Sequence, residues 1–372
     1  MNSSGTQSRQ HSFLLGAVVL ITSVALFGAA ELAVRVRQHI KFGSLLRIED
    51  TYTVDAKSGL RIPVPGGSFG GIRINSLGFR GPELKVPKPA STVRIAFLGS
   101  STTYCAEVSS NENAWPHLVA QALHAHWSGS TVDYVNAGVP GYSVASSLQN
   151  LKSRVAPLDP DIIVIYEGHN DLSGNSFHLA LKQGLVTGQT EQNLSWPARY
   201  SLLWYLVQKN LRIVSQQRTA RATEAKLRFN KEDLTAPFYH DLTTLVDASK
   251  TVTPQVVLVT FSTQLRASQA AEEQTRAAVS SLYYMPYMSV DGLLEAYASY
   301  NEVLARVAQE TGSILIGGEN FIPGDAKHFV DSIHFTDLGS RAMADRVVRG
   351  LLDSQAVQDV FSRQSASLAV KR

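Results

Sequence analysis

The sequence has very little cysteine and no concentration of charge of one sign. Its 372 residues include one cysteine, Cys105, which excludes an intrachain disulfide and any metal site built from several thiolates. The 34 basic and 31 acidic residues leave a net charge of +3 and are spread along the chain, without the basic clusters that bind a phosphate backbone. We therefore expect no nucleic-acid partner, and we expect Cys105 to be a small buried residue rather than a nucleophile.

Charge is absent from one long stretch near the N-terminus. Phe13 to Ala30 (FLLGAVVLITSVALFGAA) are 18 residues without a charge, and at about 1.5 Å per residue such a helix nearly spans a hydrocarbon core of roughly 30 Å. We expect a transmembrane anchor over residues 12–34. The alternative is a cleaved signal peptide with Gly28 and Ala30 at the cleavage site, but the apolar run is longer than the core of such signals.

The charges around this segment bear on its orientation. Arg9 precedes the apolar run, whereas Arg35, Arg37 and Lys41 follow it. The positive-inside rule would keep this more basic side in the cytoplasm, so the rule alone argues against export of the remaining chain. Glu31 either lies at the membrane interface or ends the span.

Beyond the anchor, apolar runs of strand length alternate with helical patterns. The apolar runs lie at Val93–Leu98, Val132–Val135, Asp161–Tyr166, Gln255–Phe261 and Ser313–Ile316. Apolar residues three and four apart predict helices at Ala114–His126, Val144–Val155, Asp241–Ser249 and Gly292–Glu310. Continuous apolar strands are buried on both faces, so we expect an α/β fold, a parallel sheet between helical layers with ligands at the carboxyl ends of its strands.

Two segments depart from this alternation. Residues 35–90 are rich in glycine and proline, and short alternating stretches such as Ile72 to Asn75 predict hairpins in a collar that packs on the main domain. Residues 173–236 hold an aromatic amphipathic stretch (198–214) and a basic polar helix (216–228). A lid or membrane-facing insertion and a set of extra core-packing helices are equal alternatives for this segment.

Chemically useful side chains follow several of the predicted strands. Ser101 comes after the first strand in "FLGSSTT", Gly141 lies in "NAGVPGYS" after the second, and Asn170 lies in "YEGHNDL" after the third. Near the C-terminus, Asp331 precedes His334 by three residues in "DSIH". Each fragment alone is a weak signal, but the carboxyl ends of parallel strands meet at one edge of a sheet.

Together these residues supply what acyl transfer through a serine needs. The hydroxyl of Ser101 requires a base, His334, whose other ring nitrogen requires a carboxylate, Asp331, to fix the tautomer. The tetrahedral oxyanion requires fixed donors, which the N–H of Ser101, the N–H of Gly141 and the side-chain amide of Asn170 can provide.

Other residues compete for these roles. Ser100 is the alternative to Ser101 as nucleophile, and His240 and His328 are the alternatives to His334 as base. We rank both histidines lower because we expect an aspartate three residues earlier to single out His334.

Further histidines offer no stronger site. His124 and His126 have alternate spacing without a nearby cysteine or carboxylate, so we expect no metal there. Whether His169 lines the pocket is left open.

The four blocks "FLGSSTT", "NAGVPG", "GHND" and "DSIH" resemble, in order, those of the SGNH or GDSL hydrolases. The resemblance covers residues 91–352 and implies Ser101 as nucleophile, Gly141 and Asn170 in the oxyanion hole, His334 as base and Asp331 as its orienting acid. It implies a three-layer, flavodoxin-like sandwich with a five-stranded parallel sheet, and no metal or other cofactor. The first block departs from the family, whose usual Gly-Asp-Ser has aspartate where Ser100 stands. The lead-in "NSLGFRGPE" and the anchor resemble a membrane-tethered subgroup.

From this resemblance we expect a membrane-anchored serine esterase that hydrolyses a small acyl, in particular acetyl, ester on a cell-envelope carbohydrate. Its catalytic domain would lie on the extracytoplasmic, periplasmic side, and its oligomeric state is left open. The alternatives are an O-acyltransferase that uses the same site and a non-catalytic glycan-binding protein with this fold. The expected limits are 1–11 for an N-terminal tail, 12–34 for the anchor, 35–90 for the lead-in, 91–352 for the hydrolase domain and 353–372 for a C-terminal tail.

Overall fold

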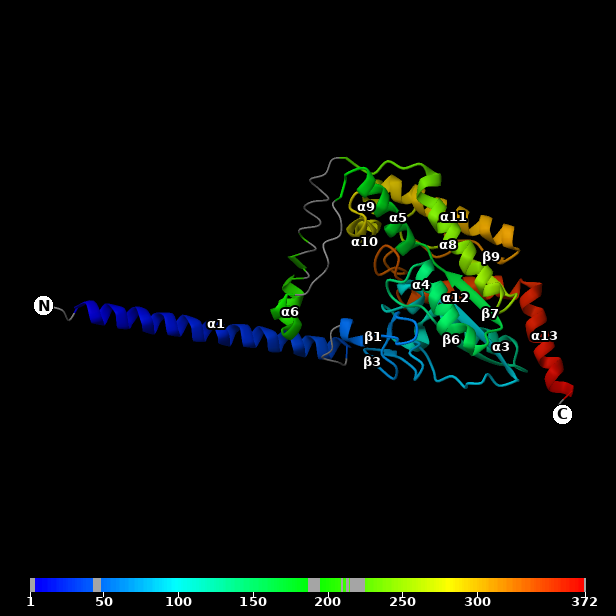
Figure 1. Ribbon diagram of the computed structural model, residues 1–372, viewed down its shortest axis with the longest axis horizontal. Helices are drawn as coiled ribbons and strands as arrows, with labels where there is room; N and C mark the ends of the chain where they lie inside the picture. The colour runs from blue at the N-terminus through cyan, green and yellow to red at the C-terminus, as the bar shows by residue number, and fades with distance from the viewer. Residues whose placement is uncertain are drawn as a thin grey trace. The chain divides into compact units, whose positions relative to one another are not determined.

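The computed structural model describes residues 4–42, 48–186, 195–208, 210–211, 214 and 225–370. The chain forms two compact units. Unit 1 comprises Met1–Arg47 with Thr190–Ser215, and unit 2 comprises Ile48–Gln189 with Gln216–Arg372. Unit 2 holds the sheet and most of the helices, whereas unit 1 holds the long N-terminal helix (Figure 1).

A five-stranded parallel sheet forms the centre of unit 2, with the strand order β6-β5-β7-β8-β9. Its strands are β5 (Thr92–Gly99), β6 (Thr131–Asn136), β7 (Ile162–Tyr166), β8 (Val256–Val259) and β9 (Ile314–Ile316). All residues of β5, β7 and β8 are buried, as continuous apolar runs require. Each apolar run found in the sequence falls on one of these strands, so the predicted sheet is confirmed.

Helices flank the sheet on both faces. They are α2 (Ser101–Tyr104), α3 (Trp115–His126), α4 (Val144–Asn150), α5 (His169–Lys182), α8 (Lys231–Lys250), α9 (Ala271–Ala277), α10 (Val279–Tyr284), α11 (Val290–Thr311), α12 (Asp337–Leu352) and α13 (Gln355–Val370). α3 packs on α12 and β6, whereas α8 packs on α4, α5 and α11. Crossovers between parallel strands are almost always right-handed, and the connections β5–β6 and β6–β7 run in opposite directions across the sheet. Their helices therefore belong to opposite faces, the two outer layers of the predicted sandwich.

The lead-in forms two short hairpins before the sheet begins. β1 (Tyr52–Val54) pairs with β2 (Arg61–Pro63), and β3 (Ser68–Phe69) pairs with β4 (Ile72–Arg73), both antiparallel. The alternating residues of this segment therefore predicted hairpins correctly. Arg80 follows the second hairpin, and its buried guanidinium bonds to the loop after α2 in unit 2.

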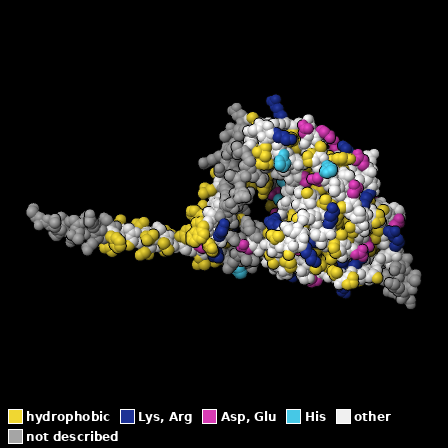
Figure 2. Space-filling view, viewed as in Figure 1, with side chains coloured by type: hydrophobic (Ala, Val, Ile, Leu, Met, Phe, Trp, Pro, Cys, Tyr) yellow, Lys and Arg dark blue, Asp and Glu magenta, His cyan; other side chains and the backbone are white. Residues whose placement is uncertain are grey.

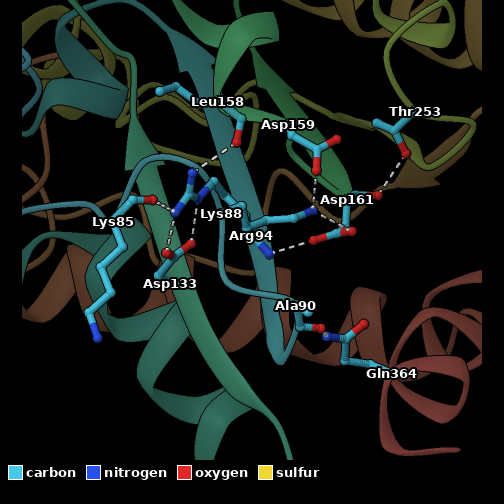
Figure 3. Close-up of polar contacts among 10 residues, drawn as sticks. All are labelled: Lys85, Lys88, Ala90, Arg94, Asp133, Leu158, Asp159, Asp161, Thr253 and Gln364. Carbon is cyan, nitrogen blue, oxygen red and sulfur yellow. Dashed lines mark hydrogen bonds and ion pairs between the residues drawn. The ribbon is translucent and has the colours of Figure 1, made fainter. Parts of the chain in front are cut away.

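A polar cluster closes the end of the sheet opposite its carboxyl edge (Figure 3). The buried Arg94 side chain pairs with Asp133 at 2.7 Å, and its backbone N–H donates to Asp161 Oδ2 at 2.7 Å. Lys88 pairs with Asp161 at 2.8 Å and with Asp159 at 3.1 Å. Because these contacts join the amino ends of β5, β6 and β7, they fix the strands while the opposite edge stays available for chemistry.

The N-terminal part of unit 1 is the long helix α1 (Ser4–Phe42). Phe13–Ile40 are long and apolar enough to cross a membrane, with a mean hydropathy of 2.4, by length and composition alone. The helix runs beyond residue 34, where we expected the anchor to end, into the region assigned to the lead-in. No glycine or proline occurs between Ala29 and Phe42, so nothing in the local sequence stops the helix there.

The expected insertion, 173–236, is divided between the two units. Residues 173–182 belong to α5 and residues 231–236 belong to α8, both of which bury side chains in unit 2. Between them, α6 (Trp196–Tyr200) and a helical stretch at 202–208 belong to unit 1.

The structure describes only part of the basic polar helix expected at 216–228. Residues 216–224 lie outside the described residues, and 225–228 have no regular structure, so the helix prediction is wrong for this last part.

Candidate active site

Ser101 stands at the carboxyl end of β5, as the first residue of α2. Gly99 allows this sharp strand-to-helix turn, because a Cβ at that position would lie 2.1 Å from Thr103 Oγ1. The preceding Ser100 is only 2% exposed, and its carbonyl accepts the N–H of Tyr104 at 2.9 Å. Ser101 is partly exposed, so the turn presents Ser101 and buries the alternative hydroxyl.

Asp331 and His334 lie in one tight turn before α12. The turn is closed by a bridge between Phe329 and Phe335, and Val330 N–H donates to His334 O at 2.8 Å. Asp331 Oδ1 accepts the backbone N–H of Ile333 and of His334, both at 2.9 Å. These bonds fix the carboxylate beside the imidazole.

Ser101, His334 and Asp331 form a continuous hydrogen-bonded chain. Nδ1 of His334 lies 2.8 Å from Asp331 Oδ2, and Nε2 lies 2.8 Å from Ser101 Oγ. With Nδ1–H donated to the carboxylate, Nε2 is the acceptor for the serine proton. The arrangement can therefore remove a proton from Ser101 Oγ as that oxygen attacks an ester carbonyl.

The charges around His334 favour its protonated form. Burial alone would lower its pKa, but the hydrogen bond to Asp331 and the negative charges of Glu107 and Asp331 outweigh burial and hold the pKa above its ordinary value of 6.5. The pKa of Asp331 is lowered despite its burial, because His334 and two backbone N–H groups stabilise the carboxylate. The imidazolium that forms during proton transfer is thus matched by a fixed negative charge.

Gly141 and Asn170 are brought together by Tyr142, the residue that follows Gly141 and bonds to Asn170. Asn170 Nδ2 donates to Tyr142 O at 2.7 Å, which leaves the second N–H of the amide for a ligand. Gly141 has φ +87°, a conformation that favours glycine. Within the described residues, neither Gly141 N–H nor Ser101 N–H donates to a protein acceptor. Val139 N–H bonds to Gly99 O at 3.2 Å, so this loop lies against the turn that carries Ser101.

The competing histidines occupy other places. Asp325 stands three residues before His328 and lies 2.7 Å from its Nδ1, so the expectation that such a partner singles out His334 is wrong. Contact with Ser101 Oγ distinguishes His334 instead, while His240 lies within α8. His169 is buried and bonds to Tyr297 Oη at 2.7 Å, and burial lowers the pKa of His169 to about 4.

The remaining candidates from the sequence, Cys105, His124 and His126, make contacts typical of structural residues. Cys105 is buried, and burial raises the pKa of its thiol to about 12, which makes it a poor nucleophile. Nδ1 of His124 lies 3.0 Å from the carbonyl of Ser130, and His126 packs edge-on against Trp127.

A buried pair of carboxylates beside Asn170 was not anticipated from the sequence. Asp171 Oδ1 accepts Val144 N–H at 3.1 Å, at the start of α4, and burial raises the pKa of Asp171 to about 7. Glu167 is fully buried, and burial together with the charge of Asp171 raises its pKa well above the ordinary range. Ser147 donates to Glu167 Oε1, whereas Oε2 has no partner among the described residues. Only the proximity of two acids in "YEGHND" hinted at this pair.

Solved structures of similar proteins share little sequence with this chain. A lipase/acylhydrolase from Enterococcus faecalis is 17% identical over 70% of this chain and 95% of its own, with a TM-score of 0.41. A variant of an acetyl xylan esterase from Geobacillus stearothermophilus is 17% identical over 69% of this chain and 94% of its own, with a TM-score of 0.42. No curated protein matches.

A family model gives the stronger result. Residues 97–342, more than half of the 372-residue chain, match the model of the GDSL-like lipase/acylhydrolase family. The matched segment begins within β5 and ends within α12, so it includes all five residues placed at the carboxyl edge of the sheet. The chain belongs to the GDSL-like lipase/acylhydrolase family and is a carboxylic ester hydrolase.

Proposed function

We propose that the chain is a membrane-anchored serine esterase that removes a small acyl group, in particular acetyl, from a carbohydrate of the cell envelope. The observation that carries the esterase mechanism is the chain of two 2.8 Å contacts from Asp331 through His334 to Ser101. Ser101 Oγ attacks the ester carbonyl while its proton moves to His334 Nε2, and Asp331 stabilises the imidazolium. His334 then protonates the departing alcohol, and water, activated by the same imidazole, releases the acyl group from Ser101.

The oxyanion of each tetrahedral intermediate requires donors that are in place beforehand. We assign this role to Ser101 N–H, Gly141 N–H and the free amide N–H of Asn170, the residues described above at the edge of the sheet. Removal of one such donor typically costs about 10²- to 10³-fold in turnover. Asn170→Ala should therefore hydrolyse p-nitrophenyl acetate slower by that factor and still react with a fluorophosphonate; an unchanged rate would remove Asn170 from the oxyanion hole.

Two adjacent serines provide a matched test of the nucleophile. Ser101→Ala should abolish hydrolysis of p-nitrophenyl acetate and covalent labelling by a fluorophosphonate, because it removes the hydroxyl that contacts His334 Nε2. Ser100→Ala should retain labelling, since Ser100 is 2% exposed. Label found on Ser100 in a mass-spectrometric digest, or full activity in Ser101→Ala, would overturn the assignment.

We infer the acetyl group, the carbohydrate that carries it and the location outside the cytoplasm from the family and from the apolar helix α1. A panel of acetylated polysaccharides, compared with p-nitrophenyl esters of increasing chain length, should give the highest kcat/KM with acetyl esters. Release of free acetate supports hydrolysis, whereas acetate transferred to a second glycan identifies the acyltransferase alternative. An alkaline phosphatase fused to the C-terminus should be active if unit 2 lies outside the cytoplasm; activity of cytoplasmic reporters alone would reverse this orientation.

A further inference from the structure

Part of the insertion packs on the N-terminal helix within unit 1. Ala198, Leu202 and Tyr205 are buried in a small apolar cluster, against which Val34 of α1 and Leu206 also pack. This cluster is separate from the main hydrophobic core. The segment 195–208 is thus held by the helix that is our candidate membrane span.

A charged residue of α1 fixes this contact. Glu31 Oε2 accepts Ser201 Oγ at 2.8 Å and Leu203 N–H at 2.9 Å, and Oε1 accepts Leu202 N–H at 3.0 Å. These backbone N–H groups begin the helical stretch 202–208, where they have no partner within the helix. Glu31 therefore caps the inserted helix, which explains an acidic residue at the end of an apolar run.

The position of Glu31 sets the level of this contact along α1. Phe13 to Ala30 precede it without a charge, and 18 helical residues cover about 27 Å, close to the thickness of a hydrocarbon core. Glu31 is the first charged residue after that run, and Arg35 pairs with it at 2.6 Å. A span that starts at Phe13 would place Glu31, and the segment it caps, at the membrane interface.

The inserted helix is apolar on its outward face as well. Trp204 and Val207 are three residues apart on this helix and are 42% and 39% exposed, and Leu211, shortly after it in the chain, is 65% exposed. The residues packed toward α1, Leu202 and Leu206, occupy the opposite face. A helix that is apolar on both faces in a water-facing position would be unfavourable, so the outward face calls for a second apolar or interfacial environment.

α6 extends this outward face with two aromatic residues. Trp196 is 73% exposed and Tyr200 is 70% exposed. Figure 2 shows hydrophobic side chains gathered over α6 and along α1. Tryptophan and tyrosine have an apolar body and one polar group, and they are enriched where lipid headgroups meet the hydrocarbon.

We propose that the interfacial patch, defined as Trp196, Tyr200, Trp204, Val207 and Leu211, binds the headgroup region of the same bilayer that α1 crosses. This inference rests on the proposed anchoring by α1. A lipid surface is favoured over a protein partner because the patch belongs to the same unit as the exposed apolar surface of α1, and because Glu31, the first charged residue after the uncharged run, holds it there.

The connections of the insertion give this contact a consequence for the enzyme. Gln183 Nε2 donates to Arg228 O at 2.5 Å, and Arg228 N–H donates to Gln183 Oε1 at 3.3 Å, so the two ends of the excursion are joined in unit 2. The helix before the excursion is α5, which carries Asn170. With the patch bound to lipid, the membrane therefore holds the catalytic unit through the insertion as well as through α1.

Tryptophan fluorescence tests the patch directly, because α1 contains no tryptophan and the chain contains four, at 115, 127, 196 and 204. The full chain is reconstituted in phosphatidylcholine and phosphatidylglycerol vesicles whose acyl chains are brominated near the headgroup. In the wild type, the brominated lipid should quench the fluorescence of Trp196 and Trp204. The control Trp196→Phe/Trp204→Phe keeps only the buried Trp115 and the half-buried Trp127 of unit 2, and should show no quenching and full hydrolysis of p-nitrophenyl acetate.

Flotation of the same vesicles after an alkaline carbonate wash separates the anchor from the patch. Protein that fails to float contradicts the anchor itself. Protein that floats while aqueous iodide, and not bromolipid, quenches Trp196 and Trp204 contradicts the patch alone. Shielding from both quenchers with concentration-dependent cross-links would identify a protein partner and also overturn the proposal.

The cap provides a second variant. Glu31→Ala removes all three accepted bonds from the inserted segment, so bromolipid quenching should fall toward that of the tryptophan control while flotation persists. Glu31→Gln keeps an acceptor oxygen and should retain more quenching than Glu31→Ala. Equal quenching in wild type and Glu31→Ala would contradict the role of Glu31 in holding the patch at the interface.

Discussion

At the scale of single residues, Asp331 has two roles: it orients His334 and it stabilises the turn that carries both residues. It accepts two backbone N–H groups as well as the imidazole, so Asp331→Asn should leave the turn folded while the amide favours the wrong imidazole tautomer. We expect a loss of up to about 10⁴-fold in kcat. Circular dichroism checks the fold; a loss of less than tenfold would contradict the orienting role.

The pH dependence of activity follows from the same pair. The base must be neutral, and the pKa of His334 is raised above 6.5, so kcat/KM should fall as pH decreases through a value higher than 6.5. In Asp331→Asn the stabilising charge is gone, and the acid limb of the profile should move to lower pH. A limb that stays in place would mean that another group titrates.

The buried acids near Asn170 allow a prediction about stability. The pKa of Glu167 is raised in the folded chain, so the unfolded chain loses this proton at lower pH and stability falls as pH rises between the two values. Each unit of difference is worth about 1.4 kcal/mol. Glu167→Gln removes this cost while keeping an acceptor for Ser147, so its Tm should exceed that of wild type at pH 8 and approach it near pH 4. A pH-independent difference in Tm would contradict the titration.

At the scale of elements, the lead-in supports the turn that carries Ser101. Arg80 Nη1 donates to Tyr104 O at 2.8 Å, and Nη2 donates to Ser110 O at 2.8 Å. Arg80→Met leaves the buried carbonyl of Tyr104 without this partner, at a cost of about 1–3 kcal/mol, and leaves Ser110 O with the N–H of Asn113 alone among the described residues. We expect a lower Tm, slower fluorophosphonate labelling of Ser101 and a loss in kcat rather than in KM. The matched control Arg73→Met, at the exposed residue of β4, should change none of these; equal labelling rates in both variants would exclude a positioning role.

The sequence predicted some of these elements well and others poorly, for physical reasons. β5, β7 and β8 are buried on both faces, so their apolar runs were distinct at the sequence level. The length of α1 beyond the expected anchor was not predicted, because a helix continues through charged residues when no glycine or proline stops it. The Asp325–His328 pair repeats the spacing of Asp331–His334, and only contact in three dimensions separates the two. The roles of Arg80 and Glu31 depend on partners distant in sequence, which local patterns do not reveal.

At the scale of the whole molecule, the chain leaves unit 2 and returns to it at one place. Leu227 N–H donates to Tyr287 O at 2.9 Å, and Gln183 and Arg228 bond to each other across the base of the excursion. The residues proposed for catalysis, Ser101, Gly141, Asn170, Asp331 and His334, all belong to unit 2 and not to the excursion. The excursion is therefore attached to the hydrolase rather than built into its sheet.

This arrangement predicts the effect of replacing residues 187–224 of the full chain by a short glycine-serine linker. Because Gln183 and Arg228 already hold the two ends together, closing the loop costs little, since loop-closure entropy changes slowly with length. The variant should remain folded, with a Tm and a rate on p-nitrophenyl acetate close to wild type. If the insertion also acts as a lid, preference for acyl length or acceptor should change in this variant. An insoluble product would show instead that the insertion belongs to the core, the alternative that the separate cluster of Ala198, Leu202 and Tyr205 argues against.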